Sequence, residues 1–178
     1  VRYLLDTDDQ LIAVNDRWNV FAVENGAPEL QESAVIGRHL WSFISDATTR
    51  AIYADLLRHV RRGHAASVPF RCDGPHVRRE MHLVMRPLDA RAVECTAFYD
   101  VEIPQQPVPF WTPAPGRYIG VLLACSWCKR VQVSGVWMEA EDAVPLLPLR
   151  ADGSVPEISH GICPTCSTTL RLSAEDTL

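Results

Sequence analysis

The sequence has no apolar run long enough to cross a membrane. Its longest uninterrupted apolar stretches are of the size of the segment from Gly120 to Cys125, whereas a bilayer span needs roughly 18 apolar residues. The start at Val1 shows no basic segment followed by an apolar one, so we expect neither an export signal nor a membrane anchor. The sequence therefore predicts a cytoplasmic protein that does not bind membranes.

Recognisable catalytic motifs are also missing. The sequence contains no Ser-His-Asp order, glycine-rich phosphate loop, HExxH string or pair of carboxylates with catalytic spacing. Each of these patterns supplies the groups on which a common class of enzyme depends. We therefore expect a protein that is not an enzyme.

Lysine is almost absent, and the basic residues are unevenly distributed. All but one of the 17 basic residues are arginine, and residues 58–86 hold seven basic and two acidic residues, while the flanking segments are acidic. Within this basic belt, Arg71, Arg78 and Arg86 are expected on the outer face of a sheet, because they alternate with buried neighbours. The belt predicts contact with an acidic surface of a partner or a second copy, unless it pairs with the chain's own acids.

Proline is concentrated in one short segment. Five of the 13 prolines lie between residues 104 and 115, a density that excludes helix and favours an extended chain. We predict a linker at 103–116 between an N-terminal part, 1–102, and a C-terminal part, 117–178. A chain of 178 residues with 47% hydrophobic residues has the length and composition of one or two ordinary globular domains.

The N-terminal part has the pattern of an α+β fold. Short apolar runs at 3–5 and 11–14 predict a hairpin, and a helix follows that begins near Asp46 and ends at Gly63. Three further runs alternate between apolar and polar residues, which is typical of strands with one buried face. The order predicts a five-stranded antiparallel sheet with helices on one face.

A resemblance to PAS sensory domains covers residues 1–102. It is carried by the strings "YLLDTDDQLIAVNDRW" and "VIGRHLWSFI", by the helix ending "LRHVRRG" and by the three closing strands. The resemblance implies a sensory or regulatory domain that binds a small molecule or dimerises, with itself or another signalling protein as partner. Trp41, Phe43 and Tyr53 are expected between the helices and the sheet, as core residues or as the lining of a ligand cavity.

The most specific pattern is a pair of CxxC motifs. Cys125 and Cys128 form one, and Cys163 and Cys166 form the other, with 34 residues between them. Two such turns supply the four thiolates of a closed, structural zinc site. The strings "CSWCKRV" and "SHGICPTC" also resemble a cysteine-rich extension of bacterial signalling proteins, which implies a zinc-ribbon or treble-clef-like module.

Other metals and other ligands fit the pattern less well. Rubredoxin-like iron is the nearest rival, but Lys129 and Ser167 stand where that family usually has glycine. Haem is not expected, because neither motif reads CxxCH. His160 could replace a thiolate, but we favour a hydrogen bond from it to a ligand sulfur or to the backbone.

Two further cysteines lie in the predicted strands of the N-terminal part. Cys72 and Cys95 share the phase of the apolar strand residues, so we expect core side chains rather than ligands.

The first hypothesis for the function of the protein is a sensory module with a structural zinc site, and the second is a metal-thiolate redox sensor. Nucleic-acid binding ranks last, since residues 120–178 hold four basic and seven acidic residues.

Overall fold

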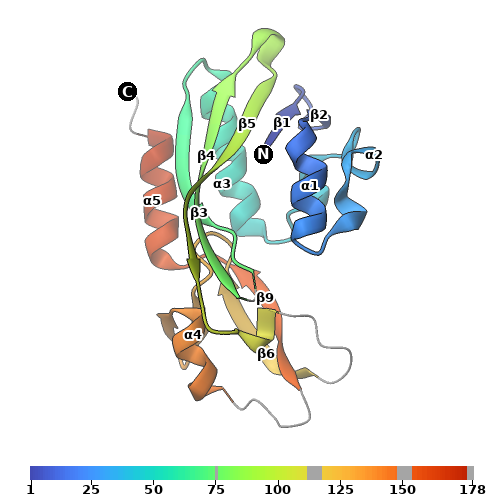
Figure 1. The fold of residues 1–178 in the computed structure, drawn as a ribbon. Helices are drawn as coiled ribbons and strands as arrows, with labels where there is room; N and C mark the ends of the chain where they lie inside the picture. The colour runs from blue at the N-terminus through green and yellow to red at the C-terminus, as the bar shows by residue number, and fades with distance from the viewer. Residues whose placement is uncertain (75, 112–117, 148–153, 176–178) are drawn as a thin grey trace.

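The computed structural model describes residues 1–74, 76–111, 118–147 and 154–175. Two sheets lie one above the other, and the last helix returns from the lower sheet to lie beside the upper one (Figure 1). None of the helices within these ranges combines the length and the apolar character that crossing a bilayer requires. The elements in chain order are β1 (Arg2–Leu5), β2 (Leu11–Val14), α1 (Asp16–Glu24), η1 (Pro28–Leu30), α2 (Glu32–Val35), η2 (Leu40–Ser42), α3 (Ala47–Arg61), β3 (Ala66–Arg71), β4 (Val77–Pro87), η3 (Asp89–Arg91), β5 (Val93–Pro104), η4 (Pro109–Trp111), β6 (Tyr118–Cys125), β7 (Val131–Val133), β8 (Val136–Met138), α4 (Ala140–Ala143), η5 (Val144–Leu146), β9 (Val155–Gly161) and α5 (Pro164–Glu175).

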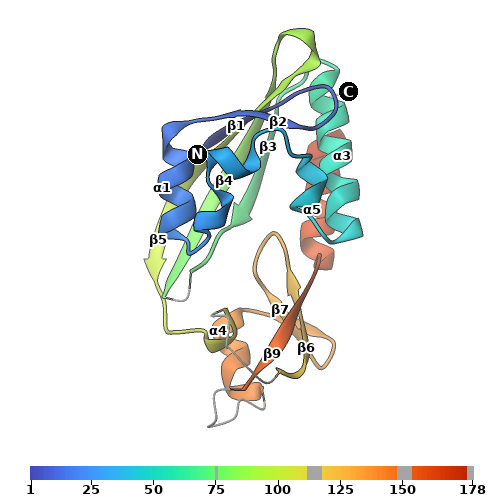
Figure 2. The ribbon, with the colours of Figure 1, turned by 90° about the vertical axis from the view of Figure 1, so that its right-hand side faces the viewer.

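The upper sheet is five-stranded and antiparallel, with the strand order β2-β1-β5-β4-β3. Alternation along β4 places Met81, Leu83 and Met85 on one face, where all three are buried. Helices α1, α2 and α3 lie on one side of this sheet (Figure 2). The predicted α+β architecture of the N-terminal part is therefore confirmed.

Helix α3 forms where the sequence predicts it. The Asp46 carboxylate accepts a hydrogen bond from the amide of Thr49 at 2.6 Å, which caps the N-terminus. Ile52, Leu56 and Val60 recur every four residues and are buried in the core. Gly63 follows the helix with a φ of +102°, a conformation that glycine adopts without steric cost.

The lower sheet has the order β8-β7-β6-β9, in which β6 and β9 are parallel. Strands β7 and β8 form a hairpin with its turn at Ser134 and Gly135, both of which have positive φ. Val108 and Phe110, from the proline-rich segment, are buried in the core of this lower part. The segment predicted as a linker at 103–116 thus begins as the end of β5 and then packs into the lower part through Val108, Phe110 and Trp111. Its remainder, 112–116, lies outside the described residues.

The two parts of the chain share one buried core. Cys125, Trp127, Cys163 and Leu170 belong to the same cluster of buried residues as the side chains of α3 and the upper sheet. Helix α5 lies along the β3 edge of that sheet and contacts both β3 and α3 (Figure 1). The cysteine-bearing part is therefore attached to the upper sheet by packing as well as by the chain connection.

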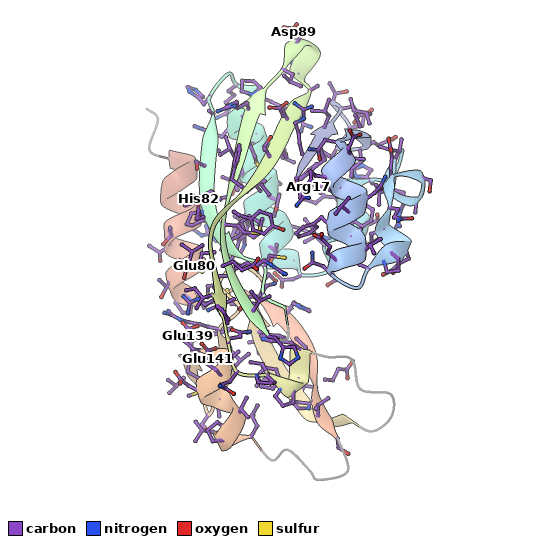
Figure 3. The ribbon with its side chains drawn as sticks, in the orientation of Figure 1. Arg17, Glu80, His82, Asp89, Glu139 and Glu141 are labelled. Carbon is purple, nitrogen blue, oxygen red and sulfur yellow. The ribbon has the colours of Figure 1, made fainter. Side chains whose placement is uncertain are left out.

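The prediction that Arg71 is exposed on the outer face of the sheet is wrong. The lower part covers the end of β3, so the Arg71 side chain is only 7% exposed and pairs with Asp73 and Glu139. Glu139 also lies 3.6 Å from Arg78 and accepts a hydrogen bond from Arg130 at 2.9 Å. Arg78 also pairs with Glu80 at 2.6 Å, so the acidic partners of Arg71 and Arg78 are residues of the same chain, and Glu139 lies at the junction of the two parts (Figure 3).

Arg86 has a different environment from the other two arginines. It is exposed on β4, where its backbone partner across the ladder is Glu94 of β5. Of the three arginines proposed to meet an acidic partner, Arg86 keeps the predicted exposure. An interface there stays a prediction.

We expect the Glu139→Gln variant to be less stable at pH 7, by about 1–3 kcal/mol, because the buried Arg71 guanidinium loses an ionised acceptor. Burial raises the pKa of Glu139, but hydrogen bonds from Arg130 and Arg71, and the charges of Arg71 and Arg78, outweigh burial and bring this pKa below its ordinary value of 4.5. A lowered folded-state pKa stabilises the fold above the unfolded value, and this contribution is lost as the pH falls through the folded pKa.

Urea unfolding of the wild type and the variant at pH 7 and at about pH 3 measures both effects, and the difference between the two proteins should shrink in acid. Glu157→Gln, at an exposed position on β9, is the matched control and should unfold like the wild type. An equal difference at both pH values would contradict the assigned role of the carboxylate.

Candidate metal centre

Four cysteine sulfurs converge at the junction of the two parts. The Sγ atoms of Cys125, Cys128, Cys163 and Cys166 all lie within 4.8 Å of one another, and those of Cys128 and Cys163 are 3.7 Å apart. Four sulfurs bound tetrahedrally at about 2.3 Å from one zinc ion would be about 3.8 Å apart. The structure therefore brings the four predicted ligands together at a spacing that fits one metal ion.

The first CxxC motif forms a tight turn between β6 and β7. The amide of Lys129 donates to the carbonyl of Cys125 at 3.1 Å, and the amide of Cys125 donates to the carbonyl of Arg130 at 2.8 Å. Lys129 has a φ of +61°, in the left-handed region that favours glycine. Its ammonium group donates to the carbonyl of Ser126 at 3.2 Å, so the lysine side chain helps to close the turn that contains it.

The second CxxC motif opens helix α5. Cys163 precedes Pro164, the first residue of the helix, a position at which the missing amide proton of proline costs nothing. The amide of Cys163 donates to Sγ of Cys125, and the amide of Cys166 donates to Sγ of Cys163, each at 3.4 Å. These amides and the positive end of the helix dipole stabilise thiolates.

Parallel pairing of β6 and β9 explains why the two motifs meet. Cys125 at the end of β6 lies opposite Gly161 at the end of β9, so both chains leave the same end of the sheet. The amide of Ser126 donates to the carbonyl of Gly161 at 2.9 Å and ties the first turn to the second. Sequence reasoning found both motifs but had no local signal for this long-range pairing.

The electrostatics of the cluster favour a bound cation. Hydrogen bonds from the thiols of Cys128 and Cys166 lower the pKa of Cys125 far below its ordinary range. The hydrogen bonds to Cys125 and Cys128, and then burial, raise the pKa of Cys166, because a second thiolate would form beside the first. Four thiolates at this spacing therefore need a positive ion to balance their charge, and a metal ion supplies it.

Two of the ligands are more accessible than the others. Cys125 and Cys163 are buried, whereas Cys128 and Cys166 are half-buried and line an open pocket of about 240 Å³ together with Trp127. With four protein ligands, a tetrahedral ion at this cluster would have no position left for substrate. The donor set thus fits a structural site, with one side facing a pocket.

One of the two contacts expected for His160, a hydrogen bond to a ligand sulfur, is not formed within the part of the chain that the structure describes. His160 lies in β9 opposite Ala124 and is exposed, and within the described residues no hydrogen bond links it to a cysteine sulfur. The amides of Cys163 and Cys166 make those contacts instead. Because every residue except proline carries an amide, no residue type in the sequence pointed to this role.

Cys72 and Cys95 lie outside the four-cysteine cluster. Cys95 is buried in the core of the upper sheet, and burial raises the pKa of its thiol to about 12. Burial likewise raises the pKa of Cys72. Both side chains are therefore protonated thiols at neutral pH.

An apolar cavity of about 270 Å³ lies between the helices and the upper sheet. Tyr53 lines it, whereas Trp41 and Phe43 pack against the core, the other position expected for them. The Trp41 indole donates to Asp9 at 3.0 Å, and the Phe43 ring lies under the guanidinium of Arg38. Side chains from the first strand and first helix take their place. The cavity is lined by Val1, Tyr3, Trp18, Phe21, Ala22, Asn25, Ala27, Leu30, Tyr53, Phe70, Cys72, Met81, Leu83 and Ala97.

Comparisons of the chain with protein-family models, with curated proteins and with solved structures find no match. The four-cysteine cluster and the apolar cavity are close to each other in the fold. Both lie against the same helix, α3, because Tyr53 lines the cavity and stacks on Trp127 within the first CxxC turn, with ring centroids 5.3 Å apart.

We expect the Cys125→Ser variant to lose its metal ion and several kcal/mol of stability, since structural zinc supplies about 10–16 kcal/mol of apparent binding energy in small peptides. The upper sheet should lose stability as well, because Cys125 and Trp127 belong to its core. The measurements are metal content by elemental analysis and thermal unfolding followed by circular dichroism.

Cys95→Ala serves as the control for this experiment. It should keep its metal and lose only about 1–2 kcal/mol through core packing. Equal metal content in the wild type and the Cys125→Ser variant would contradict the ligand assignment.

Proposed function

We propose that the chain is a cytoplasmic sensory module in which a PAS-like domain is joined by a structural zinc site to a C-terminal helix. The observation that carries this proposal is the double role of Tyr53, which lines the apolar cavity and stacks on Trp127 between two metal ligands. The order of elements and the single helical face of the sheet also support it, since both agree with the PAS resemblance.

Zinc is the metal that we assign to the cluster. Four thiolates in a closed tetrahedral set are typical of structural zinc. Lys129 and Ser167 replace the glycines usual after the turns of a rubredoxin-like iron site, and the Lys129 side chain contributes to its own turn. The ion would fix the start of α5 to the end of β6.

The cavity is the sensory site in this proposal. Its lining is almost wholly apolar, with the phenols of Tyr3 and Tyr53 and the amide of Asn25 as polar groups. A small, mostly apolar molecule fits such a lining, because burial of apolar surface supplies affinity and a few polar groups fix orientation. The chemistry of the cavity thus favours a compact aromatic or aliphatic ligand.

A short chain of contacts leads from the cavity to α5. Tyr53 contacts Trp127, and the carbonyl of Trp127 accepts a hydrogen bond from the amide of Arg71 at 2.6 Å. Trp127 lies between Cys125 and Cys128, which share the metal cluster with the two cysteines that open α5. A ligand that moves the Tyr53 ring would therefore act on the metal turn and on the helix.

The signal would pass to a second copy of the chain or to another signalling protein. Phe98, Val101 and Ile103 of β5 are exposed apolar residues, and their partners on the neighbouring strand β4 are His82, Glu80 and Arg78. Exposed apolar side chains next to charge are typical of protein contact surfaces. The module would thus act by contact rather than by catalysis.

A second candidate, a metal-thiolate redox sensor, is favoured by the accessibility of Cys128 and Cys166 in the 240 Å³ pocket. Hydrogen peroxide would oxidise these two thiols to a disulfide, and its two oxygen atoms would leave as water. The metal ion would then lose two ligands.

We expect the purified protein to contain about one zinc ion per chain and to show no visible absorption band. Elemental analysis together with an absorption spectrum tests this at once. Iron in place of zinc, or a haem Soret band, would overturn the assignment of the cluster.

The sensory role is tested with substituted benzenes as cavity probes. A probe at about ten times its Kd should stabilise the wild type by about 1.4 kcal/mol and slow the release of zinc to a chromogenic chelator. Ala97→Leu, which fills the cavity, should abolish binding, whereas Tyr53→Leu should bind the probe without slowing zinc release. Zinc release that is insensitive to bound probe in the wild type would contradict the sensory coupling.

A further inference from the structure

A second pocket of the upper part is strongly basic. It has a volume of about 430 Å³ and lies beside the C-terminal half of α3, where the β1–β2 turn, η2 and η3 meet that helix. Four arginines and one aspartate supply its charged lining, which gives it a net charge of +3. The lining residues are Asp9, Trp41, Ala54, Leu57, Arg58, Arg61, Arg62 and Arg91.

Arg61 is held in place at this pocket. Its guanidinium donates to the Asp9 carboxylate at 2.6 Å, to the carbonyl of Asp6 at 2.7 Å and to the carbonyl of Arg91 at 3.2 Å. These bonds use Nε and Nη2, and Nη1 has no hydrogen bond to any residue within the described ranges. A pre-oriented guanidinium with a free edge binds an anion at a small cost in side-chain entropy.

The carboxylate of Asp9 is fully engaged in this arrangement. One of its oxygens accepts from Arg61, and the other accepts from the indole of Trp41 at 3.0 Å. The single acid of the pocket therefore positions two lining residues, and it cannot neutralise the remaining arginines.

The other arginines leave positive charge unmatched. Arg58 pairs with Asp55, whereas Arg62 and Arg91 are exposed and form no ion pair in the part of the chain that the structure describes. Arg91 has a φ of +65°, which is uncommon for any residue other than glycine, asparagine or aspartate. The chain thus carries an arginine at this rim despite an unfavourable backbone conformation.

We propose that this pocket binds a small molecule with two or more adjacent anionic groups, phosphate or carboxylate. Guanidinium groups match both anions by paired, charge-assisted hydrogen bonds. Nη1 of Arg61 is the inner donor, and the side chains of Arg62 and Arg91 are the donors at the rim. A pocket of this volume has room for a small ligand. The site is separate from the metal centre and from the apolar cavity, and it stands whether or not the proposed function holds.

Titration calorimetry at constant ionic strength tests the proposal. The probes are pyrophosphate for phosphate groups and propane-1,2,3-tricarboxylate for carboxylates, with sodium chloride as the blank and zinc content measured before and after. We expect saturable binding of at least one probe with a stoichiometry near one. Pyrophosphate alone would assign phosphate as the source, and tricarboxylate alone would assign carboxylate.

Matched variants separate a site from general charge attraction. Arg62→Gln removes a rim donor and should weaken binding about tenfold, as the loss of one charge-assisted hydrogen bond predicts. Arg91→Gly removes another donor while its backbone suits glycine, so it should fold like the wild type and bind as weakly as Arg62→Gln. Arg17→Gln, an equal change of charge on α1 (Figure 3), should bind like the wild type.

Two results would overturn the proposal. One is the absence of saturable binding of both probes to the wild-type protein. The other is equal weakening in the Arg62→Gln and Arg17→Gln variants, which would mean that the anions respond only to net charge.

Discussion

The contact of the first CxxC turn with β3 and α3 holds the two sheets of this protein together. The amide at the end of β3 donates to the carbonyl of Trp127, and the indole of Trp127 stacks on Tyr53. Any ion in the cysteine cluster is therefore fixed against the upper sheet, and the ion pairs of Glu139 with Arg71 and Arg130 brace the same junction from the side of α4. Because these contacts are short and buried, the two parts are expected to move as one body.

The contacts at this junction explain part of the uneven distribution of basic residues along the sequence. The basic belt that the sequence shows divides into arginines that the chain uses itself and arginines that face solvent. Arg71 pairs with Asp73 and Glu139, and Arg78 pairs with Glu80 and Glu139. Arg62 of the belt, in contrast, keeps its charge available at a pocket that it shares with Arg91, which lies just beyond the belt. The net charge of a sequence segment thus indicates where anions are attracted, but the contacts of the folded chain determine which arginines stay unpaired.

Features that depend on neighbouring residues were predictable from the sequence, and features that depend on docking were not. The cap at Asp46, the hairpin at Ser134 and Gly135 and the two CxxC turns are set by residues within a few positions of one another. The burial of Arg71 depends instead on the lower part covering an edge strand, for which no local pattern exists. The cavity shows the same division. The inward position of Tyr53 was predictable from the periodicity of α3, but the positions of Trp41 and Phe43 depend on how the segment around η2 packs against the β1–β2 turn.

The position of Leu170 affects the order in which the parts of the chain fold. This residue of the last helix is buried in the core that also holds the first strands, so residues near the two ends of the chain meet in one cluster. Contacts between distant residues close large loops and form slowly. During synthesis the upper sheet would therefore leave the ribosome with one side of its core uncovered, until the second pair of cysteines arrives and α5 docks. Capture of the metal and completion of the core would then be a single late step in folding.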